Sequence, residues 1–304
     1  MLVNMKELLA AADENDFAVP AFNISSYAMF NGIMDISEKK NAPVIIEIHP
    51  DELNHIGTEV IAGMIKRAAE SAIPTVIHMD HGASFADIMA AIRAGFTSVM
   101  IDGSSLPYEE NVAICKKVAE AAHAADNCSN YAASKYARNV SVEGELGNIG
   151  TTDAEKAFTQ VIHYTQPDEA VKFIKETGID TLAIAIGTCH GLYPKGYKPE
   201  LKLDLLKDIK KAIKDAGLDT KLVLHGGSNN PDEEIATASK TGISKINISS
   251  DIKVAYYQKM REILKDDDIR EPSEIEPACI AAMQEAAAQK FDLFGASGKA
   301  SLYE

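Results

Sequence analysis

The stretch PTVIHMDHGASFADIMAAIRAG, residues 74–95, contains one complete unit of the pattern that decides the fold. Its first part, residues 74–81, is an apolar run with β-forming residues and predicts a short buried strand. The strand ends in a His-Gly pair, and a helical pattern with Gly95 as its C-cap follows. A buried strand that is followed at once by a helix predicts half of a parallel βαβ unit.

The same strand-then-helix pattern recurs along the whole chain. Seven further β-rich runs span residues 17–24, 42–49, 98–103, 139–147, 181–187, 221–227 and 245–250. Apolar strands that alternate with helices predict a parallel sheet buried on both faces. Eight such units predict an α/β fold, a (β/α)8 TIM barrel. A doubly wound open sheet is the alternative, although no GxGxxG follows the first strand.

Composition limits the classes of function. The chain has 304 residues and a formal net charge of −15, which excludes the basic surface that nucleic acids and anionic membranes require. Four cysteines without CxxC spacing are typical of reduced thiols in a cytoplasmic protein. We expect a single domain over 1–304. Helical patterns at 251–267 and 276–295 exceed the needs of a barrel and predict extra C-terminal helices that pack in a homodimer or homotetramer.

Three histidines stand at matching places in the pattern. His81 and His225 lie at the ends of predicted strands, His190 closely follows one, and each directly precedes a glycine. The carboxyl ends of barrel strands meet at one face, where TIM barrels place their active sites. One such histidine is usually a hydrogen-bonded structural residue. Three together favour a metal site, because three imidazoles leave the fourth position of a tetrahedral Zn²⁺ open.

Acids gather at the same predicted face. Asp80 precedes His81, Asp102 ends the fourth strand, and Glu143 and Glu145 lie two apart on one face of the fifth. A lone acid is usually a cap or a solvated charge. Several acids around a cation favour catalysis, since a carboxylate beside a metal stays ionised and can act as a base.

The last two strand ends carry a second signal. Barrels often bind phosphate with the loops after strands seven and eight, and here those loops offer Gly-Gly amides and the hydroxyls of Ser228, Ser249 and Ser250. Plain turn and N-cap roles are an equal alternative for Ser228. His49, at the end of strand two, is either a substrate contact or solvated. Lys245 is expected to be a solvated charge at the start of strand eight.

Taken together, the motifs VPAFNISS, PVIIEIH, HMDHGAS, SVMIDGSSLPYEENV, VEGELGNIG, IGTCHGLY, LHGGS, KINISSDIK and FGASGKA resemble a known family. The chain resembles the class II, metal-dependent ketose-bisphosphate aldolases, which include fructose- and tagatose-bisphosphate aldolases. The resemblance runs nearly end to end.

The resemblance implies a role for each matching residue. His81, His190 and His225 would bind a catalytic Zn²⁺, and Asp102 and Glu145 would hold it in an alternative position. Asp80 would be the acid/base at the aldehyde-side hydroxyl, and Asp153 aligns with a loop glutamate that protonates the enediolate carbon. The implied substrate contacts are Asn23, Gly191, Lys195, Gly226, Ser228, Asn247 and Ser250. A monovalent cation near the phosphate is compatible with this site.

Departures from the family's pattern affect the substrate. Strand two ends in EIHPDE, the strand-seven loop reads SNNP, and Ser249 stands where the fructose enzymes have Asp. His49 and Asn229 would therefore reshape the aldehyde half of the pocket, and Arg138 could pair with an acidic tail. We expect reversible cleavage of a ketose 1-phosphate or 1,x-bisphosphate to dihydroxyacetone phosphate and an aldehyde that need not be phosphorylated.

Four alternatives stay open at this point. The first is a fructose-1,6- or tagatose-1,6-bisphosphate aldolase proper, and the second is a non-catalytic sugar-phosphate-binding barrel. A zinc hydrolase often carries an HxH on strand one, where this chain has AFNIS. A class I aldolase would need a Schiff-base lysine inside the barrel.

Overall fold

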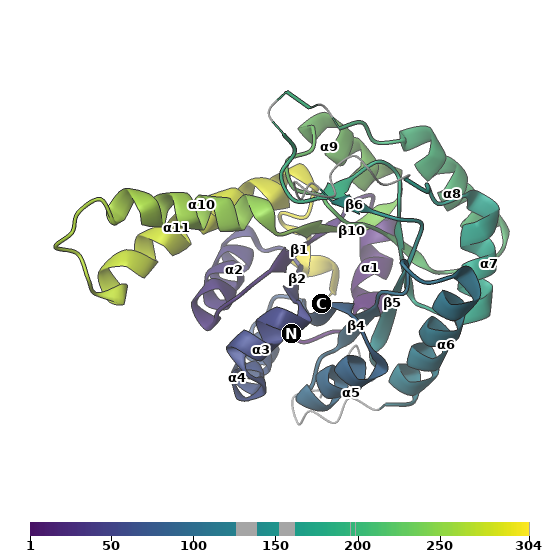
Figure 1. The fold of residues 1–304 in the computed structure, drawn as a ribbon, viewed down its shortest axis with the longest axis horizontal. Coiled ribbons are helices and arrows are strands. Elements are labelled where there is room, and N and C mark those ends of the chain that lie inside the picture. Colours follow the sequence, from purple (N-terminus) through teal and green to yellow (C-terminus); the bar gives the residue numbers. More distant parts are fainter. Residues whose placement is uncertain (126–138, 152–161, 195, 198, 304) are drawn as a thin grey trace.

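The computed structural model describes residues 1–125, 139–151, 162–194, 196–197 and 199–303. Within them, eight parallel strands form a closed barrel (Figure 1). The strands are β1 (Val19–Asn23), β2 (Val44–Ile48), β3 (Thr75–Gly82), β4 (Ser98–Ile101), β5 (Ser141–Leu146), β7 (Thr181–Ile184), β9 (Lys221–Leu224) and β10 (Ile243–Ile248). The ring closes where β1 pairs with β10, from Val19 opposite Lys245 to Phe22 opposite Ile248. The TIM-barrel prediction is confirmed, and the open sheet is excluded.

Helices surround the barrel because a helical segment with buried residues on one face lies between successive barrel strands. They are α2 (Tyr27–Lys40), α3 (Pro50–Ile56), α4 (Thr58–Glu70), α5 (Phe85–Ala94), α6 (Tyr108–Ala124), α7 (Pro167–Thr177), α8 (Leu203–Asp215) and α9 (Asp232–Thr241). The unit at 74–95 shows the local causes. Ser84 caps α5 by accepting from the Asp87 N–H, and Gly95 ends the helix in the left-handed conformation.

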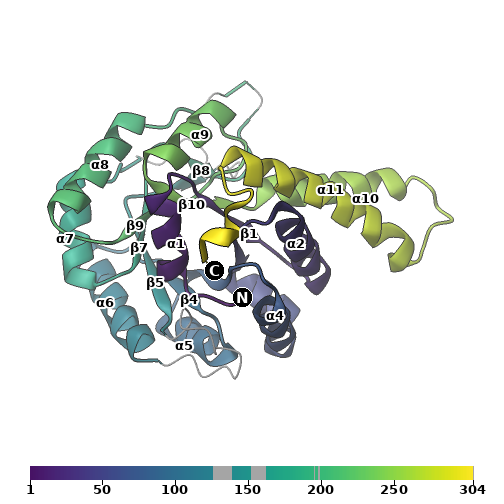
Figure 2. The same ribbon diagram turned by 180° about the vertical axis from the view of Figure 1, so that it is seen from behind.

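Both ends of the described chain lie at the amino-terminal end of the barrel (Figure 2). Helix α1 (Met5–Glu14) packs against β9 and β10 there. The short 3-10 helix η1 (Lys299–Tyr303) lies beside it, and Tyr303 Oη donates to the Leu8 carbonyl at 2.7 Å. This end is therefore closed, and the opposite end of the barrel is left for the site.

A pair of long helices, α10 (Ser250–Ile263) and α11 (Pro272–Leu293), projects from the barrel (Figure 1). This confirms the extra C-terminal helices. Helix α11 packs closely on α2, because a Cβ built at Gly32 would lie 2.7 Å from the Ile280 and Met283 side chains. None of the described helices has the length and apolar character needed to cross a membrane.

One predicted strand is shorter than expected. Strand β7 ends at Ile184, and the chain turns at Gly187, whose φ of 117° few other residues adopt. Cys189–His190 instead forms β8, which pairs in parallel with β6 (Gly150–Thr151) in a separate two-stranded sheet. His190 is therefore presented by a loop sheet and not by a barrel strand.

The expectation that Lys245 is solvated is wrong. Lys245 is the third residue of β10 and is fully buried inside the barrel. Its Nζ lies 2.8 Å from Glu47 Oε1 and 2.8 Å from Glu143 Oε2, and both acids are fully buried as well. An isolated buried ammonium would be costly, so the two carboxylates offset its lost hydration. The barrel interior beneath the site is therefore charged.

Candidate active site

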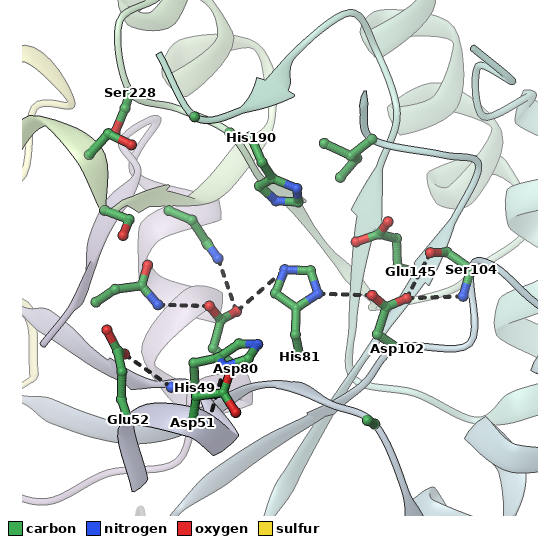
Figure 3. A pocket seen from close by; sticks show the side chains of 18 of the residues that line it. His49, Asp51, Glu52, Asp80, His81, Asp102, Ser104, Glu145, His190 and Ser228 are labelled. Carbon is green, nitrogen blue, oxygen red and sulfur yellow. Dashed lines mark hydrogen bonds and ion pairs between the residues drawn. The ribbon is translucent and has the colours of Figure 1, made fainter. Parts of the chain in front are cut away.

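Three imidazoles converge at the open end of the barrel, and Figure 3 shows two of them, those of His81 and His190. One nitrogen from each of His81, His190 and His225 can be chosen so that all three atoms lie within 4.8 Å of one another. His225 Nδ1 is 3.1 Å from His81 Nε2, and the ring centroids of His81 and His190 are 5.2 Å apart. Residues from β3, β8 and the loop after β9 thus form one donor cluster, as the His-Gly spacing predicts.

Asp102 orients the His81 ring. Its Oδ2 lies 2.9 Å from His81 Nδ1, which leaves Nε2 facing the cluster. The other oxygen accepts from the Ser104 N–H at 3.0 Å and from Ser104 Oγ at 2.7 Å. Burial alone lowers the pKa of His81, but the carboxylates of Asp80 and Asp102 outweigh it and raise that pKa to about 10. The His81 site thus favours positive charge strongly.

Glu143 orients the His225 ring from below. Its Oε1 lies 2.7 Å from His225 Nε2, so Nδ1 is turned toward the cluster. His78, fully buried, has its Nε2 3.8 Å from Glu143 Oε2. Burial lowers the pKa of His225 more than Glu143 raises it, which favours the neutral, ligand-competent imidazole. The sequence places Glu143 on the same strand face as Glu145, two residues away, but it does not predict the contact of Glu143 with His225.

Glu145 completes a donor set that suits a divalent metal. Its Oε2 is buried, has no hydrogen-bond partner among the described residues, and lies 3.6 Å from His225 Nδ1. Burial, together with Asp102, raises the pKa of Glu145 to about 8. A buried carboxylate oxygen without a partner beside three imidazoles fits Zn²⁺, which prefers nitrogen and carboxylate ligands. Glu145 also forms a second metal-capable group with His81 and Asp102.

Asp80 is held as an ionised base next to the cluster. Asn23 Nδ2 donates to its Oδ2 at 2.7 Å, and Asn247 Nδ2 donates to its Oδ1 at 3.3 Å. Burial alone raises the pKa of Asp80, but His81, His225 and Lys245 outweigh it and hold that pKa well below its usual range. The side chain can therefore accept a proton from a hydroxyl placed beside the metal-capable cluster.

A cavity of about 860 Å³ surrounds these groups. Asn229, which we expected to reshape the aldehyde half, is exposed and does not line this cavity. The cavity is lined by Asp80, His81, His190, Asp102 and Glu145, and by the other described residues that we expected to contact substrate. Those are Asn23, His49, Gly191, Gly226, Ser228, Asn247, Ser249 and Ser250. Asp153, Lys195 and Arg138 lie outside the described residues. Sequence reasoning missed Asp51, Glu52, Ser104 and Lys253, which also line the cavity.

The corner at β8, β9 and β10 is built for close backbone approach. Gly226 has a φ of 63°, and a Cβ there would lie 2.5 Å from the Cys189 carbonyl oxygen. Ser228 Oγ accepts from the Asp251 N–H at 3.4 Å, so it lies at the first turn of α10. Helix α9 begins with Pro231 as its N-cap. Backbone amides and hydroxyls meet here at a helix N-terminus, which favours an anion.

A family model described as "Fructose-bisphosphate aldolase class-II" matches residues 3–299. The chain belongs to this family. It is therefore a class II aldolase, a lyase, which removes the zinc-hydrolase alternative. The fructose-bisphosphate aldolase of Staphylococcus epidermidis strain ATCC 12228 is 37% identical over 98% of this chain and 99% of its own length. That of Geobacillus stearothermophilus is 38% identical over 99% of both chains.

A solved aldolase has the same fold as this family member. The crystal structure of the YdjI aldolase from Escherichia coli K12 superimposes with a TM-score of 0.83 and 30% sequence identity. The match covers 99% of this chain and 100% of that one. The likeness extends through the barrel and the terminal helices, but the substrate of this chain depends on its own pocket.

Proposed function

We propose that this class II aldolase reversibly cleaves a ketose 1-phosphate, or a ketose 1,x-bisphosphate, to dihydroxyacetone phosphate and an aldehyde with Zn²⁺. One observation carries the proposal. The imidazole cluster of His81, His190 and His225 lies beside the ionised Asp80 in a cavity with an anion-binding corner. Neither the metal-capable cluster nor the base would serve cleavage of a carbon–carbon bond without the other.

His81, His190 and His225 would hold the zinc ion, with Glu145 as a further oxygen donor. A bound zinc ion supplies Lewis-acid stabilisation of the charge that develops on substrate oxygens when a bond next to a carbonyl breaks. Asp102 orients the His81 ring and Glu143 orients the His225 ring, so that one nitrogen of each imidazole faces the donor cluster.

Asp80 removes the proton from the hydroxyl on the carbon that becomes the aldehyde. Asn23 and Asn247 hold its carboxylate on both oxygens, so the base has one orientation. In the condensation direction Asp80 returns the same proton. The enediolate carbon needs a second proton donor, and we propose Asp153, in place of the family's glutamate, for that step.

The phosphate of the dihydroxyacetone phosphate half would bind at the corner between β8 and α10. Gly191 and Gly226 let the ligand approach the backbone, and Ser228, Ser249 and Ser250 offer hydroxyls and helix N-terminal amides. Asn247 reaches the same cavity. Lys195 as a phosphate neighbour and a monovalent cation near the phosphate are parts of the proposal that stand on the resemblance alone.

An aldol condensation assay tests this function. Zinc-loaded enzyme is incubated with dihydroxyacetone phosphate and a panel of phosphorylated and plain aldehydes, and products are separated by chromatography. EDTA should abolish condensation and zinc should restore it. Borohydride with substrate should trap no adduct, since Lys245 is an ion-paired ammonium whose pKa is raised overall by Glu143 and Glu47 against its burial. Binding of dihydroxyacetone phosphate without turnover of any aldehyde would favour a non-catalytic sugar-phosphate-binding barrel, and unchanged turnover in His190→Ala would show that the imidazole cluster is not the catalytic centre.

We also propose that residues 1–304 form a single domain and that the enzyme is a cytoplasmic homodimer or homotetramer. The α10–α11 pair that projects from the barrel (Figure 1) supports an assembly, because Tyr257 within α10 and Leu264 at its C-cap are large apolar side chains that are exposed. Light scattering coupled to size-exclusion chromatography measures the mass, and a monomer at micromolar concentration would contradict the assembly.

A further inference from the structure

The order of the strands separates the two halves of the cavity. The anion-binding corner follows β8, β9 and β10, whereas Asn23 ends β1, and His49 and Glu52 follow β2. Asp80 stands between them, held by Asn247 on β10 and Asn23 on β1. Figure 3 shows Asp80 between Ser228 and the group formed by His49, Asp51 and Glu52. The aldehyde half of the substrate, which begins at the hydroxyl facing Asp80, therefore extends toward β1 and β2.

Lys253 is the one lysine or arginine among the described residues that line this cavity. It lies in the first turn of α10, and its Nζ donates to Glu52 Oε1. The same oxygen accepts from Ser25 Oγ at 2.7 Å, and Glu52 Oε2 accepts from the His49 N–H at 3.3 Å. The Ser25 hydroxyl and the N–H of His49, the N-cap of α3, thus help to hold the Glu52 carboxylate against the lysine.

Apart from the histidines, the other charged residues in the described lining are acidic. Besides Glu52, the described lining includes Asp51, Asp80, Asp102 and Glu145. A second phosphate would bring a charge near −2 to the β1–β2 side, where it would meet Asp51, Asp80 and a lysine already neutralised by Glu52. A carboxylate tail would meet the same repulsion. A chain of hydroxyls would not, because hydroxyls donate to carboxylates and accept from an ammonium without adding charge.

We infer that Glu52, by neutralising Lys253, selects an uncharged, hydroxylated aldehyde and rejects one that carries a phosphate or a carboxylate. This inference rests on the proposed aldol reaction and specifies its second substrate. Glu52 is a specificity-determining residue in this account, and Lys253 is a cation withheld from the substrate.

The test compares three aldehydes in condensation with dihydroxyacetone phosphate and zinc: glyceraldehyde, glyceraldehyde 3-phosphate and glucuronate. The unsubstituted enzyme should show a kcat/KM at least about 10-fold higher for glyceraldehyde than for either charged aldehyde. Glu52→Gln keeps an oxygen acceptor but frees the charge of Lys253. In Glu52→Gln, Lys253 can therefore bind the phosphate of glyceraldehyde 3-phosphate, which should raise kcat/KM for this aldehyde by about 10-fold or more.

Two further variants isolate the cause. Asp51→Asn removes one negative charge from the same helix without touching Lys253, so it should change the ratio of the two glyceraldehydes by less than about 2-fold, as expected for an exposed charge. In Glu52→Gln combined with Lys253→Met, the gain for the phosphorylated aldehyde should disappear. Thermal unfolding and zinc content of each variant show that it is folded and loaded.

The outcomes separate this inference from the proposed function. A preference of the unsubstituted enzyme for glyceraldehyde 3-phosphate or glucuronate overturns the inference and leaves the aldolase intact. Equal shifts in Glu52→Gln and Asp51→Asn overturn the specific role of the Glu52–Lys253 pair. Absence of zinc-dependent condensation with any of the three aldehydes contradicts the proposed function itself.

Discussion

Glu143 contacts both His225, at 2.7 Å, and Lys245, at 2.8 Å, so one buried carboxylate links an imidazole of the donor cluster to a fully buried lysine. Through Lys245 the link reaches Glu47 on β2. The orientation of His225 therefore depends on a charge balance deep in the barrel as well as on the residues that face substrate.

Replacing Glu143 by Gln should weaken both folding and metal binding. The amide leaves Lys245 with one carboxylate partner, and breaking a buried ion pair costs roughly 3–5 kcal/mol. Loss of the charged acceptor on His225 should lower zinc affinity about 10- to 100-fold. Urea unfolding and chelator competition measure the two effects. Glu176→Gln, an exposed acid on α7, serves as control, and similar results for both variants would refute this role of Glu143.

Asp102→Asn should lower zinc affinity with little loss of stability. Asp102 is only partly buried, and its main partner is the His81 ring at 2.9 Å. The neutral amide favours less strongly the His81 tautomer that carries its proton on Nδ1 and leaves the Nε2 lone pair free to bind zinc. The zinc affinity should therefore fall about 10- to 100-fold. Ser104→Ala, which removes one donor to Asp102, should have a smaller effect in the same chelator titration. A larger effect for Ser104→Ala would contradict this order.

Gly226→Ala should be far more damaging than Gly178→Ala. Both glycines have left-handed φ angles, 63° and 71°, and the conformational cost of alanine there is about 1–2 kcal/mol. A Cβ at Gly178 meets nothing within 4 Å, whereas one at Gly226 lies 2.5 Å from the Cys189 carbonyl oxygen. Urea unfolding and kcat/KM should separate the variants, and equal losses would mean that the Gly226 loop relaxes freely.

Asp180 should give the fold an acid-sensitive contact. Burial raises its pKa, but His123 at 2.7 Å, the Val142 N–H at 2.9 Å and Lys6 lower it more, so the folded pKa is below the usual value. The native state then binds fewer protons than the unfolded state, and stability rises with pH in that window. The contribution is present above about pH 4, the unfolded pKa, and is lost as pH falls through the folded pKa.

Asp180→Asn should therefore flatten the acid limb of the stability curve. Urea unfolding between about pH 3 and 6 measures it, since that range spans the unfolded pKa of aspartate. Asp204→Asn, at an exposed site on α8, is the matched control. An unchanged acid limb in Asp180→Asn would show that other carboxylates control the acid response.

The barrel and the cluster of His81, His190 and His225 were predictable because each gives a repeating pattern in the sequence. Each strand is an apolar run, and three of the strand or loop ends repeat His-Gly. The pair β6 and β8 left no such mark, because two-residue strands have no periodicity. The prediction that Lys245 is solvated was wrong although the sequence contained the information to correct it. Asn247 was expected in the cavity, and side chains two residues apart on a strand lie on the same face, so Lys245 also points into the barrel.

The Glu52–Lys253 contact could not be read from sequence. Its partners come from helices near the two ends of the chain, and they meet only because β1 lies between β10 and β2 in the closed ring. No local pattern records such a meeting. The sequence shows the acidic residues of EIHPDE, but it does not show that Lys253 is the cation that Glu52 neutralises.

The seam between β1 and β10 joins one of the first strands to be synthesised to the last. On the ribosome, β1 therefore presents an unpaired edge until residues 243–248 have left the exit tunnel. Unpaired strand edges promote association with other chains, and nascent chains are most exposed to it. Chaperone capture of this enzyme during translation should thus persist until β10 emerges.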